Sequence, residues 1–177
     1  MYITHPNEKL YELFKQKPYQ GVAPENALFL FIGLDANYAE NTSSQGVFPK
    51  IIEYHHNGVS FWKKYNVHHP FLLPEYKGDG RLYHRSFAKT GFLPSHAPMI
   101  SFIELLHVPT VGRSRLVPSD LDKQHLTYID SAIMDGHSRH IFVSSAVAKL
   151  MKLSGAFPWL KSKPEVINDG LSVYHRH

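Results

Sequence analysis

Short apolar runs alternate along the chain with stretches of amphipathic spacing. Continuously apolar or nearly apolar runs at residues 27–32, 98–106 and 140–143 are typical of strands that are buried on both faces of a sheet. Apolar positions between these runs recur at helical spacing, as they do in helices that cover a sheet. Strands that alternate with helices predict an α/β fold: a three-layer α/β/α domain with a central, mostly parallel sheet of about four strands.

Capping residues mark where the predicted helices begin. Asn7 predicts a first helix that Pro18 ends, and Asn57 predicts the start of the second of two helical stretches between residues 46 and 67. Ser119, with an aspartate three residues later, resembles a capping box, and Ser145 is a further capping candidate. The remaining elements are predicted as a loop at 68–80, a helix at 81–90, a helix over 121–136 and a closing strand or hairpin at 165–167 and 171–174.

Length and composition predict one globular domain over residues 1–177. Hydrophobic residues make up 43% of the chain and charged residues 19%, which is far from the composition of disordered proteins. No cysteine is present, so disulfides, thiolate metal sites and cysteine nucleophiles are excluded. The amino-terminal segment lacks the pattern of a secretion signal, and the apolar run at 27–32 is too short to cross a bilayer. We therefore expect no membrane association and a cytoplasmic location.

The chain is basic and rich in histidine. Its formal net charge is +4, which favours polyanionic partners, of which DNA is the commonest. Among its 13 histidines are the adjacent pairs His55-His56 and His68-His69, whose side chains diverge on a helix or strand. Only a loop could fold them into one metal site, so we expect no metal or cofactor, and a histidine-based metal protein stays an alternative.

The loop after the first apolar run carries the strongest candidate chemistry. Asp35, Asn37 and Tyr38 follow Gly33 directly, and ligands on open α/β sheets bind beyond the carboxyl ends of the strands. Asp35 is either a functional carboxylate or a cap of the following turn. The phosphate-loop, dinucleotide, nucleophile-elbow and H-E-x-x-H motifs are all absent.

Four segments in this order resemble the uracil and mismatch DNA glycosylase superfamily, and its mismatch-specific branch most of all. They are Gly33-Leu34-Asp35-Ala36; Gly46-Val47-Phe48-Pro49 with Asn57 and Phe61-Trp62-Lys63; residues 100–110 with a Pro-Thr turn; and residues 140–151. The resemblance implies a hydrolase that cleaves the bond between a sugar and a flipped-out modified or mismatched base. It implies Asp35 as the catalytic residue that orients water, and DNA as the partner.

The resemblance also implies the base-binding residues, which are Leu34, Asn37, Tyr38, Phe48 and Glu104. Phe48 corresponds to an aromatic platform for the base, and Asn37 stands where the uracil-specific branch has a larger tyrosine, which implies a looser pocket. Glu104 stands where relatives recognise the base edge. Because an ionised carboxylate only accepts hydrogen bonds, we expect either a base with adjacent N–H donors or a protonated Glu104. Alternatively, Glu104 points outward and pairs with a cation.

DNA contacts are expected from Arg113, Ser114 and Arg115, which follow the Pro-Thr turn. The superfamily usually has a His-Pro-Ser or Asn-Pro-Ser loop after its last strand, whereas this sequence offers only His175 by analogy and lacks the proline and serine. A catalytically inactive nucleic-acid or nucleotide-binding protein on the same fold therefore remains the alternative function.

Overall fold

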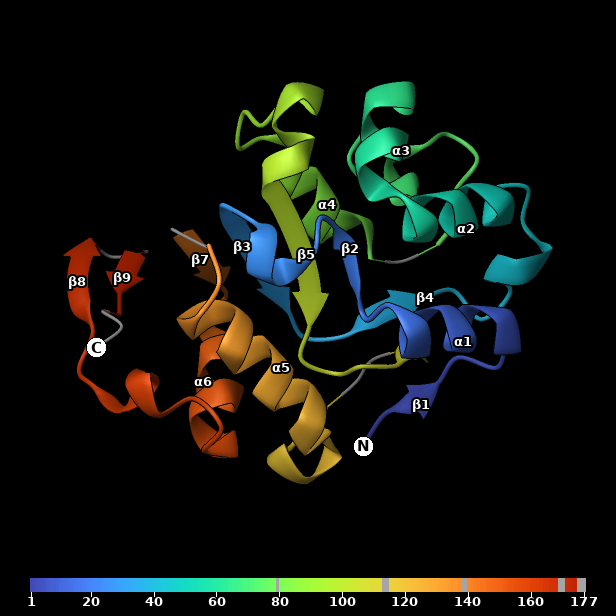
Figure 1. Ribbon diagram of the computed structural model, residues 1–177. Coiled ribbons are helices and arrows are strands. Elements are labelled where there is room, and N and C mark those ends of the chain that lie inside the picture. Colours follow the sequence, from blue (N-terminus) through green and yellow to red (C-terminus); the bar gives the residue numbers. More distant parts are fainter. Residues whose placement is uncertain (79, 113–114, 138–139, 169–170, 175–177) are drawn as a thin grey trace.

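The computed structural model describes residues 1–78, 80–112, 115–137, 140–168 and 171–174 (Figure 1). The α-helices are α1 (Glu8–Gln16), α2 (Phe48–His56), α3 (Gly58–Tyr65), α4 (Arg81–Ala88), α5 (Lys123–Met134) and α6 (Ser145–Ser154). The strands are β1 (Ile3–Thr4), β2 (Tyr19–Gly21), β3 (Phe29–Gly33), β4 (Ala36–Tyr38), β5 (Ile100–Glu104), β6 (Pro109–Val111), β7 (His140–Val143), β8 (Glu165–Asn168) and β9 (Leu171–Val173).

A four-stranded mixed sheet, in the order β2-β5-β3-β7, runs through the middle of the molecule (Figure 1). Strand β3 pairs in parallel with both β5 and β7, whereas β2 pairs antiparallel to β5. The three apolar runs of the sequence therefore form the parallel part of this sheet. The predicted combination of helices and sheet is confirmed as a mixed α/β fold. The sheet was predicted to be mostly parallel and is mixed, because the short strand β2, which the sequence pattern does not predict, pairs antiparallel to β5.

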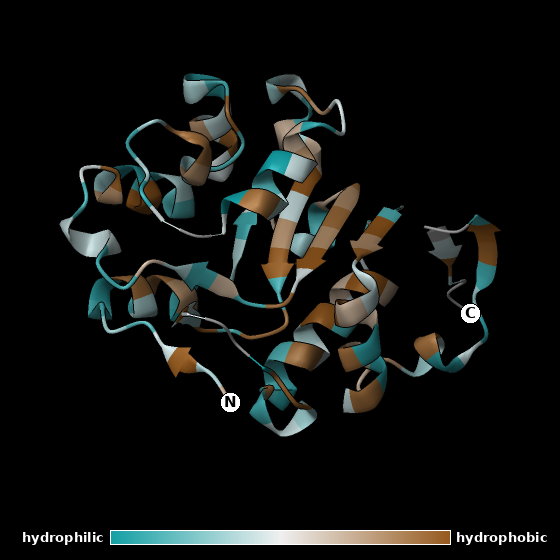
Figure 2. Cartoon of the chain, turned by 180° about the vertical axis from the view of Figure 1, so that it is seen from behind, coloured by the Kyte–Doolittle hydropathy of each residue, from teal (hydrophilic) through white to brown (hydrophobic). Residues whose placement is uncertain are grey.

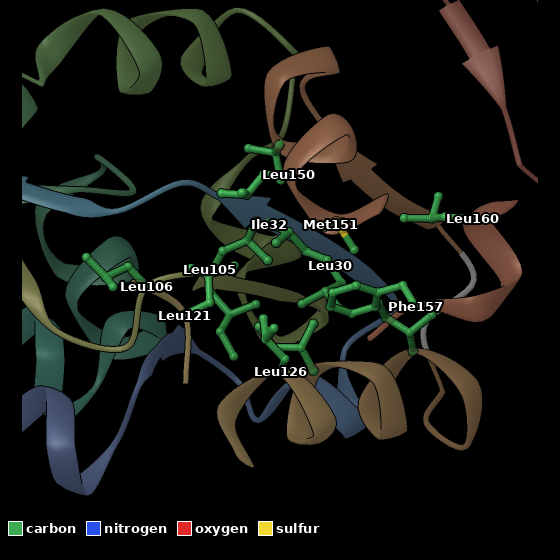
Figure 3. Packing of buried hydrophobic residues seen from close by; sticks show 14 of the residues in the cluster. Leu30, Ile32, Leu105, Leu106, Leu121, Leu126, Leu150, Met151, Phe157 and Leu160 are labelled. Atoms are coloured by element: carbon green, nitrogen blue, oxygen red, sulfur yellow. The ribbon is translucent and has the colours of Figure 1, made fainter. Parts of the chain in front are cut away.

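The two faces of β3 pack against different groups of helices. Side chains alternate along β3, so that Leu30 and Ile32 join one core cluster and Phe31 joins another. The first cluster includes residues of α5 and α6, and Figure 3 shows Leu30 of β3 lying between Leu126 of α5 and Met151 of α6. The second contains Trp62 of α3 and Phe87 of α4. Both faces of β3 are thus buried, as its continuous apolar run predicts.

A second, three-stranded sheet has the order β1-β6-β4. Strand β4 follows β3 after two residues and pairs in parallel with β6, with Asn37 opposite Thr110. Each of these strands is two or three residues long, too short to show a period in the sequence, and none was predicted. The segments that follow β3 and β5 therefore lie side by side, because they pair with each other in this sheet.

Helix caps are partly as predicted. The side chain of Asn7 accepts a hydrogen bond from the Leu10 amide, and that of Asn57 accepts one from the Ser60 amide, both at 2.9 Å. The predicted caps at Ser119 and Ser145 are wrong. Asp122 caps α5 and Ser144 caps α6, because each helix begins after an extended residue whose side chain reaches an amide three positions ahead.

The predicted closing hairpin is present as the antiparallel pair β8 and β9. Its turn residues Asp169 and Gly170 lie outside the described residues. In the hydropathy view the hairpin stands apart from the apolar interior strands, and Val166 and Ile167 of β8 are exposed (Figure 2). Across the described ranges, none of the helices combines the length and apolar character that crossing a bilayer would require.

Candidate active-site pocket

A cavity of about 360 Å³ lies at the carboxyl ends of the parallel strands. Gly33 at the end of β3, Glu104 at the end of β5 and Val143 at the end of β7 all line it. The size falls within the range of small-ligand sites, about 300–1,000 Å³. Position and size together make this cavity the candidate functional site.

Asp35 lies on the wall of this cavity and is held by a residue distant in sequence. The hydroxyl of Thr110, a fully buried residue of β6, donates a hydrogen bond of 2.6 Å to Asp35 Oδ2. The amide of Asn37 donates to the Thr110 hydroxyl at 3.4 Å and to the Gly112 carbonyl. The pairing of β4 with β6 thereby holds one oxygen of the carboxylate in place at the wall of the cavity.

Glu104 lines the same cavity as Asp35, and its position depends on a neighbouring glycine. Gly33 is its register partner on β3, and a Cβ atom added to Gly33 would lie only 2.6 Å from Glu104 Cδ. The absence of a side chain at Gly33 therefore makes room for the carboxyl group. On the backbone side, His125 Nε2 donates to the Glu104 carbonyl at 2.7 Å, which ties β5 to helix α5.

The surroundings of Glu104 favour its neutral form. Burial, and as a second cause the nearby charge of Asp35, raise the pKa of its carboxyl group to about 8. Burial likewise raises the pKa values of the phenols of Tyr38, Tyr54 and Tyr83, with the charge of Glu104 as a further cause for each. The described lining contains no lysine or arginine. Glu104 thus faces the pocket, and the described residues form no ion pair with it.

Stacked phenylalanines form an apolar wall of the cavity, one from each parallel strand. Phe31 is the register partner of both Phe102 and Phe142. Its ring stacks on Phe102 with centroids 5.4 Å apart and on Phe142 with centroids 4.7 Å apart. Phe142 is 43% exposed and leaves an aromatic surface open beside the cavity.

Two stacked histidines line the cavity from the segment around α4. The rings of His69 and His84 are 3.5 Å apart and nearly parallel, and His68 Nε2 lies 3.2 Å from His84 Nδ1. Burial lowers the pKa of each of these imidazoles, so all of them are neutral at neutral pH. The loop predicted at 68–80 contains a short 3-10 helix at Pro70–Leu72, which His69 caps by accepting from the Phe71 amide. Within the described ranges, no three histidine, aspartate or glutamate side chains are grouped as a metal would need.

The predicted site residues divide into those that meet at the cavity and those that do not. The members at the cavity are Leu34, Asp35, Asn37, Tyr38 and Glu104. Phe48 is half-buried at the start of α2 and is not part of the lining. Arg115 is exposed beside the amino terminus, where its amide donates to the Met1 carbonyl. Arg113, Ser114 and His175 lie outside the described residues.

Several lining residues were not identified from the sequence. They are Gln20, Phe31, Tyr54, His69, Phe71, Tyr83, His84, Phe102 and Phe142. Only the phenylalanines of the parallel strands could have been identified from the sequence, because they occupy equivalent positions in the three apolar runs. The tyrosines and histidines come from helices and loops whose docking no local pattern reveals.

Comparisons of the chain with known protein families, with curated proteins and with solved structures find no match.

Proposed function

We propose that the chain is a DNA glycosylase-like hydrolase that cleaves the N-glycosidic bond of a flipped-out modified or mismatched base. In this proposal residues 1–177 form one uracil-DNA-glycosylase-like domain, and helices on both faces of the mixed sheet make its three layers. The observation that carries the proposal is that Asp35 and Glu104 face one aromatic-lined cavity at the carboxyl ends of β3 and β5. A cytoplasmic role in base excision repair is part of the same proposal.

The cavity suits a planar aromatic ligand with polar edges. Its apolar wall of Phe31, Phe102 and Phe142 offers stacking, which contributes about 1–3 kcal/mol per base in single-strand-binding proteins. The carboxyl of Glu104 and the phenols around it offer hydrogen bonds to the base edge. In our proposal Phe142 takes the stacking role that the sequence motif suggested for Phe48.

Asp35 supplies the chemistry of bond cleavage. Its carboxylate accepts a proton from a water molecule, whose oxygen bonds to the anomeric carbon of the sugar. The bond between this carbon and the base nitrogen breaks, and its electron pair leaves with the base. Positive charge develops on the sugar in such reactions, and a fixed carboxylate stabilises it. The hydrogen bond from Thr110 keeps the carboxylate oriented before the substrate arrives.

We expect Asp35→Asn to abolish base release while leaving the fold intact, since an amide cannot accept the proton. Loss of a general base typically lowers the rate by about 10²- to 10⁴-fold. The measurement is base release from single- and double-stranded oligonucleotides that carry uracil, hypoxanthine, xanthine or mismatches. Asp135→Asn, which changes an exposed aspartate outside the cavity, is the matched control. Equal release by wild type and Asp35→Asn would remove Asp35 from the mechanism.

The second candidate is an inactive nucleic-acid or nucleotide-binding protein on the same fold. The position of Phe48 outside the cavity lining favours it, because the motif that suggested a base platform is then not used as such. The net charge of +4 serves binding in either case. Salt-sensitive binding of the same oligonucleotides, with no base released from any of them, would support this candidate over the glycosylase.

A further inference from the structure

Building on the glycosylase proposal, we propose that Glu104 acts as a neutral carboxylic acid that recognises a base by a carbonyl oxygen beside a ring N–H. Uracil, hypoxanthine and xanthine, the bases produced by deamination, share this edge. The side chain would then determine the substrate class, and it would assist departure of the base.

The first support is the position of the carboxyl group. It lies at the end of the central parallel strand pair, in space that exists because Gly33 has no side chain, and its backbone is tied to α5 through His125. Both Asp35 and Glu104 line the cavity, so a base held at Glu104 lies in the same chamber as the carboxylate that activates water. The two carboxyl groups can therefore act on one ligand.

The second support is the set of groups that face Glu104. Asp35 from the β3–β4 loop is acidic, and Tyr38, Tyr54 and Tyr83, from β4, α2 and α4, are phenols. His69 and His84 line the same cavity as neutral imidazoles because burial lowers their pKa values. Within the described lining no cation compensates a charge on Glu104, so burial and Asp35 raise its pKa to about 8.

The third support is the chemistry of the two protonation states. A neutral carboxyl group has one O–H donor and one carbonyl acceptor, which pair with a carbonyl oxygen and an adjacent N–H of a base. An ionised carboxylate only accepts and would repel that carbonyl oxygen. As the base leaves with the bonding electron pair, negative charge grows on the same oxygen, and the O–H of Glu104 stabilises it by a hydrogen bond. The proton stays on Glu104, so the step balances without a further reactant.

The pH dependence of base release tests this assignment. Above about pH 8 the wild-type kcat/KM for uracil or hypoxanthine should fall, approaching roughly tenfold per pH unit as Glu104 ionises. The facing tyrosines, with raised pKa values, and the histidines, with lowered ones, keep their charge state across this range. Glu104→Gln keeps a donor and an acceptor, so it should retain release with a flat profile. Glu104→Leu should lose release.

Glu8→Gln, at an exposed glutamate of α1, is the control and should follow the wild-type profile. A wild-type profile without this fall, or the same fall in Glu104→Gln, overturns the role of Glu104 and leaves that of Asp35 untouched. Release only of bases that lack a carbonyl beside an N–H overturns the substrate class.

A binding measurement separates failure of this inference from failure of the glycosylase proposal. Fluorescence anisotropy with oligonucleotides that carry uncleavable 2′-fluorinated uracil and hypoxanthine nucleotides is measured for the wild-type protein, in which the Asp35 charge is retained, at about pH 7 and about pH 9. Tighter binding at the lower pH that disappears when Glu104→Gln is added supports the inference even if no base is ever released. Equal pH dependence with and without Glu104→Gln overturns it, because general electrostatics alone would then explain the effect.

Discussion

At the scale of single residues, the absence of a side chain at Gly33 matters as much to the cavity as the carboxyl group beside it. Gly33 ends β3 opposite Glu104, and its backbone is not in the left-handed region. The glycine is therefore required for space and not for conformation. This distinction makes its replacement a specific probe of where the Glu104 carboxyl group lies.

We expect Gly33→Ala to displace the Glu104 carboxyl group and leave the fold intact. The added Cβ would lie 2.6 Å from Glu104 Cδ, and the atoms that must move are the far end of a flexible side chain. A shift of about 1 Å in a group that positions substrate can cost on the order of 10²-fold in kcat/KM. The measurement is kcat/KM on the base that the wild type releases best, alongside the thermal midpoint.

Gly46→Ala is the matched control, because nothing lies within 4 Å of a Cβ atom added there. It should keep wild-type activity and a similar or higher thermal midpoint. If Gly33→Ala also keeps full activity and an unchanged pH profile, the room beside Gly33 is not what positions Glu104.

At the scale of elements, the sequence predicts those whose pattern is long enough to read. Three apolar runs became β3, β5 and β7, and Asn7 and Asn57 cap the helices that they were predicted to cap. The strands β4 and β6 were missed because three residues carry no period, and their pairing joins segments more than 70 positions apart. Their existence depends on tertiary contacts that no local pattern contains.

The candidate site likewise contains some residues that a local sequence pattern predicts and others that only tertiary contacts bring to the cavity. Asp35 and Glu104 could be predicted because each stands at or just beyond the end of an apolar run, where the polypeptide leaves the sheet. Phe142 could not, since its place beside Phe31 follows from the register of β3 and β7. Tyr83 and His84 enter the cavity only because α4 packs there. The local sequence pattern predicts where a strand ends, but it does not predict which distant segments line a cavity.

We expect Asn57→Ala to destabilise the protein through the start of α3. Asn57 accepts a hydrogen bond from the Ser60 amide at 2.9 Å, and alanine leaves that amide without its partner. Loss of such a cap costs about 0.5–2 kcal/mol in the free energy of unfolding. Denaturant unfolding measures the change, and Asn57→Asp, which keeps the capping oxygen, should stay close to wild type. An alanine variant as stable as the aspartate variant would show that the cap contributes nothing.

At the scale of the whole molecule, buried histidines are distributed through the interior. His55 Nε2 hydrogen-bonds to the Leu13 carbonyl of α1 and to the Lys17 carbonyl just after this helix, and burial lowers its pKa to about 4. His68 packs against Phe87, and burial lowers its pKa to about 3. Burial also lowers the pKa values of His69 and His84. These histidines are therefore neutral in the folded protein, whereas in the unfolded chain they bind protons near the ordinary histidine pKa.

The stability of the protein should consequently fall as the pH drops below the ordinary histidine pKa of 6.5. Below that pH the unfolded chain binds protons that His55 and His68 in the folded protein bind only near pH 4 and 3, so protonation favours unfolding. Each such group lowers the free energy of unfolding by up to about 1.4 kcal/mol per pH unit in this window, and above it the stability that they contribute is fully present.

Urea unfolding at a series of pH values measures the slope. His56→Gln, at an exposed histidine, should leave the slope unchanged, whereas His55→Gln should reduce it. Glu104, with its pKa raised to about 8, acts in the opposite direction over this window and offsets at most one such group. A slope that His55→Gln does not reduce would mean that this imidazole is accessible to protons in the folded state.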